Sequence, residues 1–111
     1  MTYTYSLTTN RGKVRLEIGD EVENTGVKPD GSNFTDAELQ VFLDRESDSV
    51  MRATACACEA LARHWSIVAN LTVGPRKEDL SNVAKAWGER AGELRRQYGG
   101  NAVAYTAGVM R

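Results

Sequence analysis

The stretch from Asp48 to Tyr98 decides the fold: DSVMRATACACEALARHWSIVAN (48–70), LTVGPRK (71–77) and EDLSNVAKAWGERAGELRRQY (78–98). In each long segment, residues recur at gaps of three and four, the period of one helical face. These are Val50, Thr54, Ala57, Leu61, Trp65 and Val68, and then Leu80, Ala84, Trp87, Ala91, Leu94 and Tyr98. Each helix would extend roughly 30–35 Å at 1.5 Å per residue. A short break between helices of similar length favours antiparallel packing, so the sequence predicts an all-α fold built on a long antiparallel αα-hairpin.

The first long segment is rich in alanine, which leaves little apolar area for a core. Each tryptophan buries on the order of 150–250 Å², so Trp65 and Trp87 are expected to anchor the hairpin. The predicted hairpin core consists of Leu61, Trp65, Val68, Leu80, Val83, Trp87 and Leu94.

The residues before the hairpin divide into four pieces. Residues 1–9 form an N-terminal arm in which Tyr3, Tyr5 and Leu7 alternate with small polar residues. Residues 10–19 alternate like a strand, yet Asn10 and Gly19 bracket them as helix caps, so a short helix is preferred and a strand remains open. Residues 20–33 are a turn-rich loop. Residues 34–46 are predicted to be a short helix, because Thr35 and Glu38 form a capping box; Asp48 is expected to cap the next helix.

A change of character at Gly99-Gly100 separates the helical body, residues 1–98, from residues 99–111. This last segment has no acidic residue and alternates apolar with small side chains, which is typical of an extended arm that adds to a partner's surface. Packing on its own body, or fraying, stays open as an alternative. The proposed binding residues of the arm are Val103, Tyr105, Ala107, Val109, Met110 and Arg111.

The net charge of −1 hides an uneven distribution. Residues 1–50 hold five Lys/Arg and ten Asp/Glu, whereas residues 51–111 hold nine and five. Such a division suits head-to-tail contact between copies, although a solvated surface can show it too. Gly88 and Gly92, spaced by four, indicate either close approach of another element or structural slack. The candidate subunit-interface residues are Glu21, Glu23, Arg76, Lys77, Gly88 and Gly92.

The residues do not suggest a catalytic site, a metal site or a cofactor. His64 is a lone histidine, about two helical turns from Cys56 and Cys58. The two cysteines point about 200° apart around their helix, so they cannot form a disulfide and are expected to be buried, reduced thiols. There is no phosphate-binding glycine loop, signal peptide, transmembrane run or lipidation motif. The chain is therefore expected not to be an enzyme and not to bind membranes.

The order of segments carries a resemblance. KVRLEIGD (13–20) precedes an acidic loop and NFTDAELQVFL (33–43); an alanine-rich helix ending ACEALAR (57–63), a break with Val-Gly-Pro (73–75) and a helix ending ELRRQY (93–98) follow. Over residues 10–98 this resembles the head–tail connector proteins of tailed bacteriophages, also called adaptor or head-completion proteins. Residues 2–7 have no counterpart in that pattern.

The resemblance implies a structural protein of the virion neck, made in the host bacterial cytoplasm. Its copies would form a ring, commonly a dodecamer, beneath the portal protein, with DNA passing through the centre and a tail-side or stopper protein docking below. The C-terminal segment would grip the portal, and no catalytic residues carry over. The alternative is a small helical DNA-binding or regulatory protein that contacts phosphate through Arg76, Lys77, Arg95 and Arg96, although acidic residues on the same helix oppose this.

Overall fold

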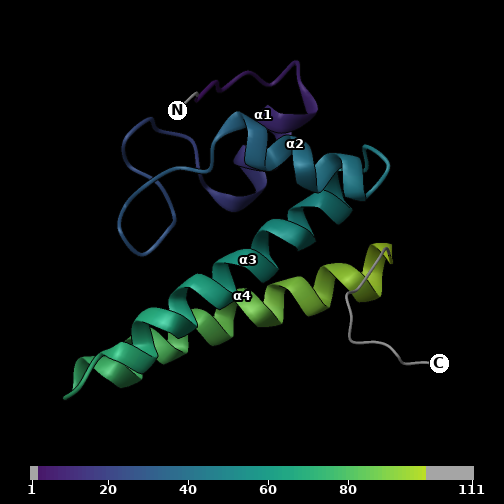
Figure 1. The fold of residues 1–111 in the computed structure, drawn as a ribbon. Coiled ribbons are helices and arrows are strands. Elements are labelled where there is room, and N and C mark those ends of the chain that lie inside the picture. Colours follow the sequence, from purple (N-terminus) through teal and green to yellow (C-terminus); the bar gives the residue numbers. More distant parts are fainter. Residues whose placement is uncertain (1–2, 100–111) are drawn as a thin grey trace.

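The computed structural model describes residues 3–99, and within that range it contains four helices and no multi-residue strand. They are α1 (Asn10–Ile18), α2 (Asp36–Arg45), α3 (Val50–Leu71) and α4 (Arg76–Tyr98). The all-α prediction is confirmed. Figure 1 shows α3 and α4 lying along each other, with α1 and α2 over one end of α3 and the α3–α4 connection at the other end. We call α1, α2 and residues 3–48 around them the head. The predicted C-terminal arm lies, apart from Gly99, outside the described residues.

Residues 10–18 form a helix, not a strand. Val14 and Ile18 are four apart and buried, whereas Leu16 is exposed, so the apparent alternation is half of a helical face. Thr9, and not Asn10, is the N-cap, accepting a hydrogen bond from the Gly12 amide at 3.0 Å. Gly19 ends the helix as predicted, at φ +79°.

The N-terminal segment lies along its own head. A Cβ on Gly12 would come within 1.7 Å of the Ser6 carbonyl oxygen, so only glycine allows this close crossing. The Tyr3 hydroxyl donates to the Asp20 carbonyl at 2.9 Å, which fixes the segment further. Residues 3–9 are therefore part of the body in this structure.

The capping box on α2 is present as predicted. Thr35 Oγ1 accepts from the Glu38 amide at 3.1 Å, and the Glu38 carboxylate accepts from the Thr35 amide at 2.8 Å. The predicted cap on α3 is wrong, because Asp48 has φ +64° and belongs to the α2–α3 turn. Ser49 is the N-cap and accepts from the Arg52 amide at 3.3 Å.

The first half of α3 is the centre of the core, because α1 and α2 cover it on one side and α4 lies along it on another. It is buried on nearly all faces, which explains why small residues fill it: bulky side chains would hold three neighbouring helices apart. The larger buried apolar residues come mostly from the head and are Val14, Ile18, Phe34, Leu39, Phe42, Leu43, Leu61 and Leu94.

The predicted hairpin core is partly wrong. Leu61 and Leu94 are buried, but Val83 is 36% exposed and is not a core residue. The indole of Trp65 donates to the Val27 carbonyl at 3.0 Å, so this ring ties the head loop to α3. The other predicted core residues are half-buried: Val68, Leu80 and Trp87. The periodicity identified the helices but could not show which neighbour each face meets.

A buried ionic centre joins the pieces of the head. Arg15 and Asp20 are both fully buried, with Arg15 Nη1 2.6 Å from Asp20 Oδ2. The same guanidinium donates to the carbonyls of Phe34 at 2.9 Å and Thr4 at 2.9 Å, and to Asp36 Oδ1 at 2.8 Å. One side chain on α1 thus holds the N-terminal segment, the loop and the start of α2. The apolar pattern gave no indication of this centre.

Candidate partner-binding surface

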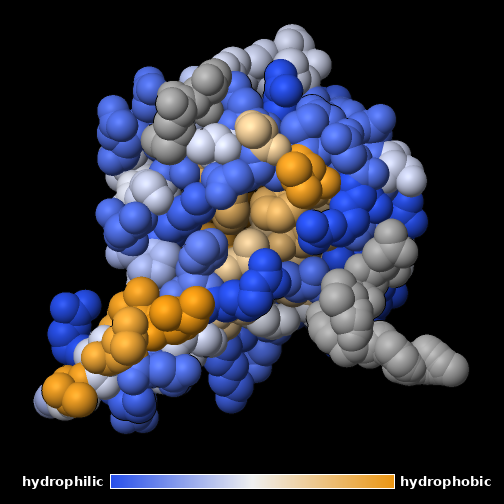
Figure 2. All heavy atoms as spheres, viewed as in Figure 1, coloured by the Kyte–Doolittle hydropathy of each residue, from blue (hydrophilic) through white to orange (hydrophobic). Residues whose placement is uncertain are grey.

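The far end of the hairpin exposes large apolar side chains. Ile67 is 58% exposed, Leu71 80% and Val73 90%, although the residues buried between α3 and α4 there are Ala69 and Ala84. Figure 2 shows these apolar side chains gathered at the lower left, where Figure 1 places the α3–α4 connection. Exposed apolar patches of this kind usually mark interaction sites. We call residues 67–77 the hairpin tip.

The hairpin tip also carries positive charge. Arg76 and Lys77 follow the exposed Val73 after Gly74 and Pro75, and both are exposed. Arg76 makes no ion pair within residues 3–99, and the Lys77 ammonium donates only to the Ala69 carbonyl, at 3.3 Å. Glu78 and Asp79 lie in the first turn of α4, where acidic side chains interact favourably with the helix dipole. Their negative charge also offsets part of the positive charge of the tip.

Glu21 and Glu23 lie on the head, on either side of Val22, which is 60% exposed. The Asn33 side chain fixes this turn: it donates to the Val22 carbonyl at 3.0 Å and accepts from the Asn24 amide at 2.7 Å. Within the described part of the chain, neither glutamate pairs with a cation. We call residues 21–25 the acidic turn.

Gly88 and Gly92 line a hollow of about 420 Å³ between α3 and α4. A Cβ on Gly88 would meet only Ala62 Cβ, at 3.9 Å, and one on Gly92 only Arg96 Nη1, at 4.0 Å. These are ordinary contact distances, so packing within the described chain does not require either glycine. Their assignment to a subunit interface stays a prediction.

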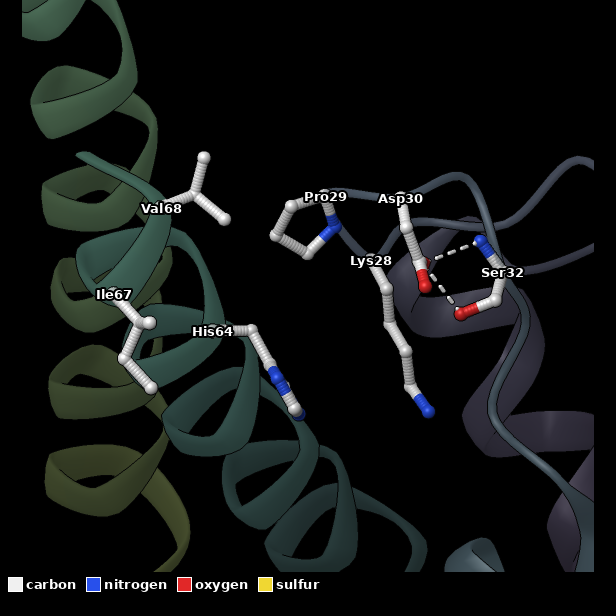
Figure 3. Close-up of a pocket in the computed structure, with 7 residues that line it drawn as sticks. All are labelled: Lys28, Pro29, Asp30, Ser32, His64, Ile67 and Val68. Atoms are coloured by element: carbon white, nitrogen blue, oxygen red, sulfur yellow. Dashed lines mark hydrogen bonds between the residues drawn. The ribbon is translucent and has the colours of Figure 1, made fainter. Parts of the chain in front are cut away.

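A second hollow, of about 400 Å³, lies between the head loop and α3. Figure 3 shows His64 from α3 and Lys28 from the loop on opposite sides of it. The polar groups are engaged with neighbours: Lys28 Nζ lies 3.0 Å from Glu38 Oε1, and Asp30 accepts from the Ser32 hydroxyl at 2.6 Å. The lining also includes Pro29, Ile67 and Val68.

The two cysteines are buried and chemically protected. Burial raises the pKa of the Cys56 thiol to about 11, with a further contribution from Glu46, whose carboxylate accepts from Sγ at 3.2 Å. Burial raises the pKa of Cys58 to about 12. Among residues 3–99 no group of three or more His, Cys, Asp or Glu side chains could hold a metal ion.

We expect both thiols to resist a thiol reagent such as Ellman's reagent at pH 8, because the reactive thiolate is scarce and each sulfur is buried. In the native protein, labelling should be at least about a hundredfold slower than in urea, where two thiols per chain react. The release of the coloured product with time measures this. Rapid labelling of one cysteine in the native state would contradict the structure around α3.

The structure thus separates the predicted surface residues into three places. Arg76 and Lys77 lie on the hairpin tip, Glu21 and Glu23 on the acidic turn, and the glycines in the α3–α4 hollow. The predicted arm residues lie outside the described part: Val103, Tyr105, Ala107, Val109, Met110 and Arg111. The sequence analysis did not identify the apolar side chains of the tip, of which Leu71 ends α3 and Val73 lies in the connection to α4.

None of the described helices is both long and apolar enough to cross a membrane. Comparisons of the chain with protein-family models, with curated proteins and with solved structures find no match.

Proposed function

We propose that this chain is a structural virion protein, the subunit of a head–tail adaptor ring that joins the portal to the tail and lets DNA pass through its centre. The observation that carries the proposal is the hairpin tip, where Leu71 and Val73 are 80% and 90% exposed while alanines are buried between the helices. A protein that functions alone gains nothing from this arrangement, because exposed apolar area remains in water. A subunit that packs against neighbours buries it.

In this proposal the long antiparallel αα-hairpin is the body of the subunit, and the two short helices are packed on it. The partners are other copies in a ring, commonly twelve, the portal protein above and a tail-side or stopper protein below. Residues 99–111, of which the structure describes only Gly99, are the segment that binds the portal, and the site of action is the neck of the virion. No catalytic step, cofactor or membrane is part of the function.

The arm can be tested by deletion. Removing residues 100–111 should leave the helical body folded, because α4 ends at Tyr98 and its last buried residue is Leu94. Binding to portal rings should fall at least about tenfold, since the apolar arm supplies the contact. Co-sedimentation with purified portal rings measures binding, and circular dichroism measures helicity. The matched control replaces residues 100–111 by a glycine–serine segment of equal length, which should also fail to bind. Normal binding by either variant would refute the arm.

The alternative, a small helical DNA-binding or regulatory protein, depends on Arg76, Lys77, Arg95 and Arg96. Two of these cations are already paired: Arg95 lies 3.1 Å from carboxylates of both Glu46 and Glu59, and Arg96 lies 2.6 Å from Glu93. Pairing within the chain reduces the charge available to phosphate. A gel shift at two salt concentrations separates the functions, because tight and steeply salt-dependent binding by the isolated subunit would favour the alternative.

A further inference from the structure

We infer that the hairpin tip of one copy docks on the acidic turn of the next copy, with Leu71 and Val73 against Val22, and Arg76 and Lys77 against Glu21 and Glu23. The inference rests on the proposed function in one respect: it supplies the contact between neighbouring subunits of a ring.

The apolar part of the argument is that both surfaces expose residues which their own copy leaves uncovered. Val22 is 60% exposed on the head, and Val73 is 90% exposed on the tip. The buried residues between α3 and α4 at the tip are Ala69 and Ala84, whereas Leu71 and Val73 point away from that contact and stay exposed. Bringing the two surfaces together removes apolar area from water on both sides.

Charge chooses between possible occupants of the tip. A second tip would bring Arg76 and Lys77 near the same cations, with only Glu78 and Asp79 to offset them, whereas the acidic turn contains no cation. The acidic turn offers two carboxylates that no cation of residues 3–99 neutralises, flanking one apolar side chain. Complementary charges around an apolar contact favour the correct register and partner.

Both surfaces are held in shape before they meet. The acidic turn is fixed by two hydrogen bonds between its backbone and the Asn33 side chain, which donates to the Val22 carbonyl and accepts from the Asn24 amide. At the tip, Thr72 donates to the Val68 carbonyl at 2.8 Å, and Gly74 has φ +91°, a conformation that glycine adopts without strain. Surfaces that are ordered in advance lose less conformational entropy on binding.

The two surfaces are different patches of one chain, so the contact is heterologous. Each copy would offer its tip to one neighbour and its acidic turn to the other. Such contacts continue from copy to copy and close into a ring when the rotation permits. A tip-to-tip contact would instead stop at a dimer.

Cysteine cross-linking of the full chain tests the contact. Val22→Cys and Val73→Cys are introduced together; Cys56 and Cys58 do not interfere because they are buried. Mild oxidation of the concentrated protein, with and without portal rings, should give a ladder of dimers, trimers and larger species on non-reducing gels. The matched control pairs Val73→Cys with Val41→Cys, which is 51% exposed on α2, and should give at least about tenfold less ladder.

Charge reversal identifies the polar part of the contact. In the cross-linking background, Glu21→Lys with Glu23→Lys, or Arg76→Glu with Lys77→Glu, should each lower the ladder at least about fivefold, and all four together should restore it. Cross-linking limited to dimers by Val73→Cys alone, an equal ladder from the Val41 control, or no ladder in either condition would overturn the inference. Portal binding without the ladder would leave the proposed function intact and refute this contact. A ladder from a protein that never binds portal would support this contact and refute the proposed function.

Discussion

Replacing Arg15 by methionine is expected to lower the free energy of unfolding by about 3–5 kcal/mol, the usual cost of breaking a buried ion pair. Asp20 is fully buried, and its Oδ2 lies 2.6 Å from Arg15 Nη1. Without the guanidinium, that carboxylate keeps hydrogen bonds from Asn33 and the Phe34 amide but has no counter-charge. The carbonyls of Phe34 and Thr4 lose donors as well. Urea denaturation followed by circular dichroism measures the change.

The control for Arg15→Met is Lys13→Met, on the same helix at an exposed position. It makes no ion pair within residues 3–99, so its effect should stay within about 0.5 kcal/mol. If both variants lose the same stability, the loss reflects helix propensity or net charge, and the ionic centre is not what holds the head together. Neutralising both partners, in Arg15→Met with Asp20→Asn, should recover part of the loss, because no uncompensated charge remains buried.

The ionic centre also makes stability depend on pH. Burial alone would raise the pKa of the Asp36 carboxyl, but hydrogen bonds from Arg15 and Thr4 outweigh it and hold that pKa below the ordinary value. A lowered pKa in the folded state contributes stability that is present above the unfolded pKa, near 4, and lost as the pH falls through the folded pKa. Wild-type protein should therefore lose stability below about pH 4. Arg15→Met should lose less over the same range, because this contribution is already missing.

The elements were predictable because they depend on local signals. The capping box of Thr35 and Glu38, the glycine that ends α1 and the periods of α3 and α4 act within one or two turns of chain. They located all four helices. Asp48 was misassigned because Asp48 and Ser49 are both good caps, and only the turn geometry, with φ +64° at Asp48, decides between them.

The relations between distant residues were not predictable from the sequence. Nothing within a few residues of Arg15 shows that its side chain meets Thr4, Phe34 and Asp36. Trp65 fits a hairpin stripe, but its indole bonds to a loop 38 positions away. At the candidate surface, the uneven distribution of charge in the sequence predicted Arg76, Lys77, Glu21 and Glu23 as interface residues. The exposure of the neighbouring apolar residues appears only once the alanines are seen to bring α3 and α4 together.

The second large loss of stability is expected from Arg95→Met, in the last turn of α4. Arg95 Nη1 lies 3.1 Å from Glu46, in the α2–α3 turn, and Nη2 lies 3.1 Å from Glu59 on α3. Nη2 also donates to Cys56 Sγ at 3.3 Å. Glu46 is 2% exposed, so removing the arginine leaves a buried carboxylate short of positive charge. Arg52 stays near it, at 3.9 Å, and we therefore expect a loss of about 2–3 kcal/mol, below the full cost of an unpaired buried charge.

The adjacent residue provides the control for this change. Arg96 lies 2.6 Å from Glu93, a shorter contact than any that Arg95 makes, but its side chain is 71% exposed. Solvent screens such a pair, so Arg96→Met should cost no more than about 0.5 kcal/mol. If the two variants prove equal, the length of an ion pair would matter more than its burial, contrary to our account of this end of α4.

Hydrogen exchange locates the effect of Arg95→Met. Among the described helices, the backbone of α4 lies against α3 alone, and its ion pairs to the head are Arg95–Glu46 and Arg90–Glu17, the latter at 3.5 Å. Without Arg95, the last two turns of α4 keep only Ala91 and Leu94 as buried contacts. Amides of residues 91–98 should then exchange faster by at least about tenfold, while those at the start of α4 change little. Uniformly faster exchange along α4 would mean that the whole helix detaches as one unit, and Arg95 would then hold the hairpin together and not merely its end.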